Sequence, residues 1–245
     1  MQLPQFKIPS LMELYSKPYD EKMVEWRRRG AVDKAKNIQK LLGGKAAEIQ
    51  RVIEVGSGTG DVLRNIAAIP IGKEFVGIEI GNDRLKETAG DQSGITFSYY
   101  DGNKIDFPDA SFDLVYATHV LEHVTNERAF LHEMRRVTRR YVYLEVPLEI
   151  HRRTSASGLN RTLQIGHINA YDFNSFMLKL ETSGLSVIAT DLFDHSLQVH
   201  QFGKSRSKAL AIMMIRKFAL ASGIGRPFLS YHCGALCVPA ARLDI

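Results

Sequence analysis

A short apolar run that leads into a glycine-rich turn constrains the fold of this chain more than any other feature. Residues 51–55 read Arg-Val-Ile-Glu-Val, which predicts a buried strand of a parallel sheet. Gly56, Gly58 and Gly60 follow within five residues and open a helical pattern over 61–69. Glycines allow a tight turn and keep side chains out of the way, so a ligand can lie against the backbone at the start of the helix.

The spacing of this turn separates two classes of ligand. Dinucleotide-binding turns need G-x-G-x-x-G, with the pyrophosphate at the helix N-terminus. Here the spacing is G-x-G-x-G, and Glu54 stands two residues before the first glycine. A carboxylate at this position would repel a pyrophosphate, and it favours a cationic ligand.

Two further acids follow at the ends of the next predicted strands. Residues 75–80 form an apolar run with Glu79 near its end, where a carboxylate can accept hydrogen bonds from both hydroxyls of a ribose. Residues 97–103 read as a third strand that ends in Asp101-Gly102, and Asp101 can accept a hydrogen bond from the exocyclic amine of a base. A solvated acid at a strand end is the alternative for each position taken alone.

Together these segments resemble the motifs of the class I S-adenosylmethionine-dependent methyltransferases, in particular the small-molecule, type 11-like members. The E-x-G-x-G-x-G turn is similar to motif I of that family, and residues 107–124, with F-P-D-x-S-F-D followed by L-E-H-V, closely match its fourth-strand signature. The resemblance covers roughly residues 50–147. It implies S-adenosylmethionine as cofactor and the following cofactor-binding positions: Glu54, Gly56, Ser57, Gly58, Gly60, Glu79, Ile80, Asp101, Gly102, Asn103 and Thr118.

Strand and helix patterns alternate along the chain, which predicts an α/β, Rossmann-like, doubly wound sheet. The resemblance adds seven strands with the last one antiparallel. Pro147 is expected to end the fifth strand. The expected strands lie near 51–55, 75–79, 95–99, 112–117, 141–146, 184–190 and 234–239, and the expected helices near 61–69, 82–89, 122–138 and 172–183.

Residues 1–44 and two segments near 148–170 and 194–227 do not follow this alternation. Residues 1–44 are expected to form an N-terminal helical lid, with Tyr15, Tyr19 and one of Arg27 to Arg29 near the cofactor, or else a helix packed on the sheet with its arginines in water. Residues 45–245 form the predicted methyltransferase domain. We expect the two segments to act as substrate caps, and the apolar stretch 207–221 to cover the acceptor pocket or contact a second subunit, with a membrane surface as the alternative.

Composition sets further limits on the function. The 245 residues suffice for a single core, and 44% hydrophobic and 24% charged residues are ordinary globular values. The net charge of +5 is spread over short clusters, which we interpret as a solvated face, so nucleic acid is an unlikely partner. The start lacks the pattern of a secretory signal, and no apolar run is long enough to span a membrane, so a cytoplasmic location is expected. Cys233 and Cys237 are expected to be buried free thiols.

Histidines are the candidate catalytic residues, because imidazole is the natural base at neutral pH. His119 follows the fourth strand, His123 lies in the L-E-H-V motif, and His167 lies in a G-H-x-x-x-Y-D element that resembles one seen in small-molecule members of the family. The alternative for His123 is a structural role, in which its side chain supports the loop after the fourth strand. No metal ligands are assigned, although His119, Glu122 and His123 have a helical spacing that would place three metal-binding groups on one face, with His151 or His167 completing a set.

The predicted function is methyl transfer from S-adenosylmethionine to an oxygen or nitrogen of a small molecule, such as a sugar, a glycolipid precursor or a secondary metabolite. An RNA methyltransferase is the first alternative, but the loop after the fourth strand reads Thr118-His119-Val120 rather than N-P-P-(Y/F). A non-catalytic subunit that keeps the fold is the second alternative. A homodimer is compatible with the sequence, which does not identify the acceptor.

Overall fold

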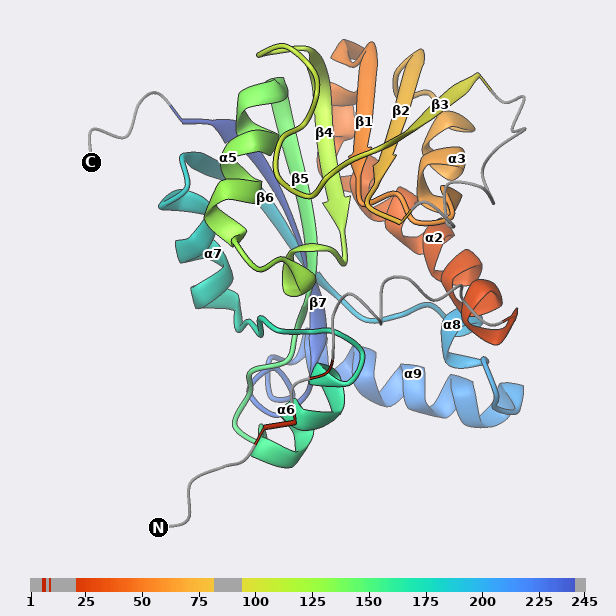
Figure 1. The fold of residues 1–245 in the computed structure, drawn as a ribbon. Coiled ribbons are helices and arrows are strands. Elements are labelled where there is room, and N and C mark those ends of the chain that lie inside the picture. Colours follow the sequence, from red (N-terminus) through yellow and green to blue (C-terminus); the bar gives the residue numbers. More distant parts are fainter. Residues whose placement is uncertain (1–5, 8, 10–20, 82–93, 241–245) are drawn as a thin grey trace.

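A seven-stranded sheet forms the centre of the computed structural model, which describes residues 6–7, 9, 21–81 and 94–240 (Figure 1). The strands are β1 (Arg51–Val55), β2 (Glu74–Glu79), β3 (Ile95–Tyr99), β4 (Phe112–Thr118), β5 (Thr138–Leu148), β6 (Leu185–Phe193) and β7 (Tyr231–Pro239). Their order is β3-β2-β1-β4-β5-β7-β6. β7 runs antiparallel to both of its neighbours, whereas the pairs among β1 to β5 are parallel. The predicted α/β fold with an antiparallel last strand is therefore confirmed.

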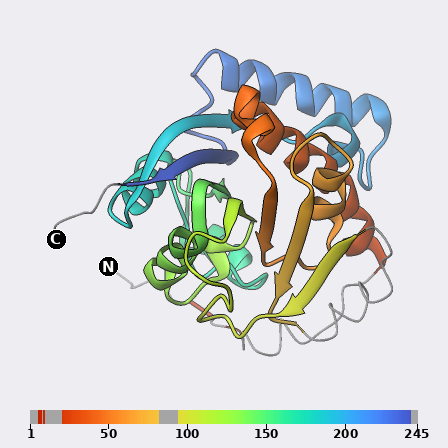
Figure 2. The ribbon, with the colours of Figure 1, turned by 90° about the horizontal axis from the view of Figure 1, so that it is seen from above.

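Helices cover both faces of the sheet and one of its ends. They are α2 (Glu21–Leu42), α3 (Asp61–Ala67), α5 (Glu127–Val137), α6 (Ala156–Leu163), α7 (Phe173–Glu181), α8 (Leu197–His200) and α9 (Arg206–Ala221), with 3-10 turns η1 (Gly43–Glu48) and η2 (Leu121–His123). α5 and α7 pack on one face, and α2 and α3 on the other (Figures 1 and 2). α6, α8 and α9 lie beyond the carboxyl ends of the parallel strands, in the lower half of Figure 1.

The buried strands explain this layering. β4 is buried at all seven positions, so its alternating side chains feed both cores: Val115 packs with the α5 and α7 side, and Leu114 and Tyr116 pack with the α2 and α3 side. α2 contributes Ala31, Ala35, Ile38 and Leu42 to the second core at helical spacing, so its apolar face packs on the sheet.

Two sequence expectations for the fold are wrong. Pro147 does not end β5, because the strand continues to Leu148 and Pro147 pairs with His232 of β7. The predicted helix 122–138 begins only at Glu127: Asn126 caps it by accepting a hydrogen bond from the Ala129 N–H at 3.2 Å, and the L-E-H residues before it form the turn η2. The predicted helix 82–89, Tyr15 and Tyr19 lie outside the described residues.

The apolar helix predicted near 207–221 is present as α9, but it does not cover a pocket. Within the described part of the chain, no α9 residue lines the cavity described below. Ala209 is its buried residue, whereas Leu210, Met214, Ile215 and Phe218 are exposed. A dimer contact through this face stays a prediction. Over the described residues, no helix is both long and apolar enough to cross a membrane.

Candidate functional site

A cavity of about 1050 Å³ opens where the carboxyl ends of β1, β2, β4 and β5 meet the start of β7. Open α/β sheets bind ligands at this edge, because the loops after parallel strands converge there. The lining comes from the glycine turn, from one face of α2, and from the segments after β4, β5 and β6. Cap segment 148–170 contributes Glu149, Gln164, Ile165 and His167, and cap segment 194–227 contributes His195 and Phe202.

The glycine turn forms one end of the cavity. Gly56, Gly58 and Gly60 have φ values of +79°, +55° and +76°, a backbone region that residues with a Cβ rarely adopt. Gly56 and Ser57 are pinned to the sheet, since both of their N–H groups donate to the Ile78 carbonyl, at 2.8 and 3.0 Å. Gly56 and Ser57 line the cavity, and Gly58 and Gly60 shape the turn behind them. The predicted bare-backbone surface is thus present.

Two buried carboxylates flank this turn. Glu79 is 3% exposed, and its oxygens accept hydrogen bonds from the N–H groups of Gly58 at 2.7 Å and Ile80 at 3.0 Å. Glu54 is 2% exposed and accepts from the Leu63 N–H at 3.1 Å. Burial raises the pKa of Glu54 to about 8, and the Lys34 ammonium opposes this rise.

The remaining predicted cofactor positions divide into two groups. Ile80, Gly102 and Thr118 line the cavity. Asp101 and Asn103 are exposed and outside the lining, and the Asp101 carboxylate accepts hydrogen bonds from the N–H groups of Asn103 at 2.8 Å and Lys104 at 3.1 Å. These bonds lower the pKa of Asp101. In this structure Asp101 therefore organises its own loop, and its contact with a base stays a prediction.

Helix α2 closes the cavity from above the turn. Of the three consecutive arginines, Arg27 lines the cavity, and a Cβ built on Gly58 would lie 2.7 Å from Arg27 Nη2. Arg29 instead pairs with Glu25 at 2.7 Å, and Arg28 lies 4.0 Å from Asp61. Met23 and Trp26 of α2 line the cavity as well.

His119 lies deep in the cavity between two acids. Its Nδ1 is 3.3 Å from Glu122 Oε1 and its Nε2 is 3.3 Å from Glu145 Oε1. Burial lowers the pKa of His119, but the two carboxylates outweigh burial and the net shift is upward. The backbone of His119 has φ +56°, and its N–H donates to the Glu145 carbonyl at 2.9 Å. The two carboxylates thus favour the protonated form of His119, which links the end of β4 to β5.

His123 and His167 face each other and form a second group of side chains in the cavity. Their ring centroids are 4.8 Å apart, at an interplanar angle of 81°. Glu122 lies beside them, fully buried. Burial raises the pKa of Glu122, but His119 and the charges of His123 and His167 outweigh burial and hold it at about 2. Burial lowers the pKa of His123.

Several lining residues carry no signal that the sequence analysis used. Lys34 of α2 is partly buried near acids, and desolvation lowers its pKa against the opposing charge of Glu145. His195 and His232 lie with ring centroids 4.3 Å apart. Burial lowers the pKa of His195 to about 4. His195 could have been identified as a candidate, because it lies in the irregular segment after β6. His232 could not, because it lies in an ordinary apolar strand. His151, an alternative metal ligand in the sequence, is outside the lining.

The residues present fit the expected cofactor. A bare turn flanked by the Glu54 and Glu79 carboxylates matches the cationic end and the ribose of S-adenosylmethionine, and the Ile80 side chain, 41% exposed, offers an apolar surface for the base. The buried Ser57 hydroxyl has no hydrogen-bond partner within the described residues, so it adds an unused polar group at this end.

Comparisons with known proteins agree with this geometry. Residues 53–144 match the family model described as "Methyltransferase domain". The chain is 30% identical over 142 residues to the ubiquinone/menaquinone biosynthesis C-methyltransferase UbiE of Xanthomonas oryzae pv. oryzae, covering 52% of this chain and 49% of that protein. It is 29% identical over 116 residues to the ajmaline N-methyltransferase of Rauvolfia serpentina, covering 44% and 39%.

The fold also matches solved structures. The phosphoethanolamine N-methyltransferase 2 of Haemonchus contortus in complex with S-adenosyl-L-methionine has a TM-score of 0.65 and 12% identity, covering 96% of this chain and 61% of that one. At this identity the likeness shows the fold alone. The chain spans about half the length of the UbiE relative it matches. In combination, the matched segment, the relatives and the site geometry identify a class I S-adenosylmethionine-dependent methyltransferase domain in this chain, with S-adenosylmethionine as its cofactor.

Proposed function

We propose that this protein transfers a methyl group from S-adenosylmethionine to an oxygen or nitrogen atom of a small molecule. The observation that carries the proposal is the single cavity that joins the glycine turn to the Glu122, His123 and His167 side chains. Two relatives, a ubiquinone/menaquinone biosynthesis C-methyltransferase and an ajmaline N-methyltransferase, support a small acceptor.

The cofactor end of the cavity has assigned roles in this proposal. The backbone at Gly56 and Ser57 and the Glu54 carboxylate hold the positive end of the cofactor, and Glu79 holds its ribose. Arg27 is placed to pair with the cofactor's carboxylate. Bound there, S-adenosylmethionine supplies an electrophilic methyl group on a sulfonium, so the donor needs no further activation.

The acceptor end does the rest of the chemistry by position and by removal of water. Much of the rate of a displacement comes from holding the attacking atom near its target in a dry pocket. Residues 1–44 act as the lid through α2, residues 45–245 form the methyltransferase domain, and the cap segments 148–170 and 194–227 select the acceptor. A neutral amine attacks unaided, whereas a hydroxyl must lose its proton.

The three predicted catalytic histidines have different parts in this proposal. His123 and His167 face the acceptor with Glu122, and an imidazole Nε2 of this group accepts the proton that an acceptor hydroxyl loses. His119, which lies 3.3 Å from both Glu122 and Glu145, positions these carboxylates. This assignment places the attacking atom beside Glu122.

Transfer of a labelled methyl group tests the proposal. Purified full-length protein is incubated with S-adenosylmethionine labelled on the methyl group and with separate metabolite, lipid, RNA and protein fractions. Label should enter the metabolite or lipid fraction. Label in RNA, with steep loss of binding as salt rises, would instead establish the RNA alternative. Cofactor binding without transfer to any fraction would favour a non-catalytic subunit.

A matched pair of variants locates the reaction. His167→Ala should reduce label transfer and leave the affinity for S-adenosylmethionine unchanged. His132→Ala, an exposed histidine on α5, is the control and should retain both. Full transfer by His167→Ala would remove His167 from the site.

A further inference from the structure

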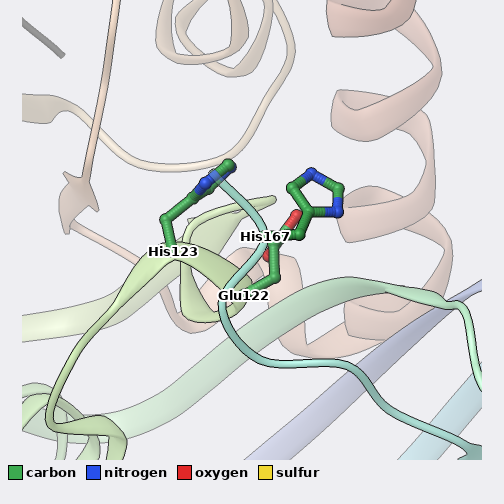
Figure 3. Close-up of side chains that lie close together, drawn as sticks. All are labelled: Glu122, His123 and His167. Atoms are coloured by element: carbon green, nitrogen blue, oxygen red, sulfur yellow. The ribbon is translucent and has the colours of Figure 1, made fainter. Parts of the chain in front are cut away.

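Glu122, His123 and His167 converge inside the cavity from two distant segments of the chain (Figure 3). Glu122 and His123 come from η2, and His167 comes from the segment between α6 and α7. One donor atom from each side chain lies within 4.8 Å of the other two. We propose that these three residues bind a divalent transition-metal ion.

The backbone holds the two segments together, so the convergence does not depend on side-chain rotamers alone. The N–H groups of Ile168 and Asn169 both donate to the Glu122 carbonyl, at 2.9 and 3.0 Å. The Asn169 amide also donates to the Val124 carbonyl at 2.7 Å. These bonds fix His167 directly opposite η2, which is the condition for a preformed ligand set.

Both imidazoles have an oxygen at Nδ1. His123 Nδ1 lies 3.0 Å from the Gly166 carbonyl, and His167 Nδ1 lies 2.8 Å from Glu149 Oε1. Because these oxygens accept a hydrogen bond from Nδ1–H, they select the tautomer in which Nδ1 is protonated and Nε2 carries the lone pair. Metal-bound histidines typically donate their other ring N–H to a carboxylate or a backbone carbonyl in this way. Glu149 and Gly166 therefore supply the outer contacts of a metal site.

Glu122 supplies the negative charge. Its side chain is 0% exposed, and within the described residues neither carboxylate oxygen has a hydrogen-bond partner. His119 Nδ1 approaches one oxygen at 3.3 Å without hydrogen-bond geometry. The neighbouring His119 offsets part of the cost of burying this carboxylate, and the oxygens keep lone pairs that a bound cation can use. Glu149 Oε2 is buried without a partner as well, and it adds a further oxygen near His167.

The donor types indicate the kind of ion. Two imidazoles and one carboxylate suit Zn²⁺, Fe²⁺, Co²⁺ or Mn²⁺, whereas Mg²⁺ and Ca²⁺ prefer sites made of oxygens. Tetrahedral ligands at zinc bond lengths are about 3.4 Å apart, so small side-chain rotations would close the site around an ion. The sequence analysis assigned no metal, and its alternative set was His119, Glu122 and His123, completed by His151 or His167. In the structure His167 joins Glu122 and His123, whereas His119 lies between Glu122 and Glu145.

If the proposed function holds, such an ion lies where the acceptor binds. An ion held by three protein ligands keeps positions open toward the cavity, where a hydroxyl of the acceptor can coordinate. A coordinated hydroxyl loses its proton more readily than a free one. The ion would therefore serve hydroxyl acceptors and would be unnecessary for amines.

Calorimetric titration with ZnCl₂ and MnCl₂ tests the site on untagged, full-length protein freed of metal by a chelator. One ion should bind per chain. Glu122→Gln, which keeps the shape and removes the charge, and His123→Gln should abolish this binding. Glu149→Gln should weaken it about 10- to 100-fold, as expected of a residue that positions a ligand. Cobalt substitution gives a second readout, a visible absorption spectrum that the Glu122→Gln protein should lack.

Two control variants locate the binding. His132→Gln, on the surface of α5, and His195→Gln, in the other histidine group of the cavity, should bind metal as the unmodified protein does. Absence of one-to-one binding, or binding unchanged by Glu122→Gln, would overturn the proposal. S-adenosylmethionine is titrated into the same metal-free samples: if it binds and metal does not, the metal site alone fails, and if it does not bind, the proposed function fails.

Discussion

Gly56→Ala is predicted to be among the most damaging single-methyl changes that this chain can receive. The residue has φ +79°, and an added Cβ would lie 2.6 Å from Val120 Cγ2 and 3.2 Å from Val120 Cγ1. An alanine in the left-handed region costs about 1–2 kcal/mol. Relief of the overlap, in a contact that normally needs about 3.5–4.0 Å, costs about 1–3 kcal/mol more. The free energy of unfolding should thus fall by about 2–5 kcal/mol.

Two further variants separate the strain from the overlap. Gly223→Ala has φ +75° with no atom within 4 Å of the new Cβ, so it should cost only the strain, about 1–2 kcal/mol. Val120→Ala in the Gly56→Ala protein removes both overlapping methyl groups, so it should recover about 1–3 kcal/mol after comparison with Val120→Ala alone.

Urea unfolding followed by circular dichroism measures these free energies, and calorimetry with S-adenosylmethionine measures binding in the same proteins. Gly56→Ala should also bind the cofactor more weakly, because the new methyl group forces the turn away from Val120. If Gly56→Ala costs no more than Gly223→Ala, or if Val120→Ala recovers nothing, the close packing of the turn on the loop after β4 is refuted.

Three further predictions concern separate parts of the molecule. Asp113 is 1% exposed, accepts hydrogen bonds from the N–H groups of Gln50 and Arg51, and pairs with Arg139 at 2.6 Å. In urea titrations Asp113→Ala should therefore lower the free energy of unfolding by about 3 kcal/mol, and a loss below about 1 kcal/mol would contradict this. Cys233 and Cys237 are both buried, and burial raises the pKa of Cys233 to about 12. A thiol reagent at pH 8 should therefore label neither cysteine until urea unfolds the chain. Rapid labelling of the native protein would show that β7 is exposed. Because the pKa of Glu54 is about 8, this group is mostly protonated at pH 7, and a cationic ligand should displace its proton. Cofactor affinity should therefore rise between pH 6 and 8. Calorimetry in two buffers of different ionisation enthalpy should detect the released proton in the unmodified protein and not in Glu54→Gln.

Much of the sheet could be predicted because its strands are short apolar runs that end at glycines or acids. β3 has the bounds predicted for it, and β1 was read correctly from Arg51 to Val55. Pro147 shows where local rules fail. Proline has no backbone N–H to donate to a neighbouring strand, yet the pairing of β5 with β7 continues past Pro147 to Leu148. The cysteines were also read correctly, since both are buried and free.

The acceptor end of the cavity could not be predicted to the same depth, because contacts between distant segments build it. The L-E-H-V motif suggested a helix with His119, Glu122 and His123 on one face, but Asn126 starts α5 later, and the freed turn meets His167 instead. The Asn126 cap was readable from the sequence. Lys34 carries no such signal, because one lysine on an amphipathic helix usually faces water.

The most direct test of the account is a calorimetric titration of S-adenosylmethionine into the full-length protein and its Glu79→Ala variant. The Glu79 carboxylate is fixed by backbone N–H groups at the cavity wall, so it is the group whose removal should matter most to a bound ribose. The account predicts one binding site per chain and an affinity at least about tenfold weaker in Glu79→Ala, from the loss of charge-assisted hydrogen bonds worth about 1.5–3 kcal/mol. No binding to the unmodified protein, or equal affinity in a Glu79→Ala protein that remains folded, would contradict it.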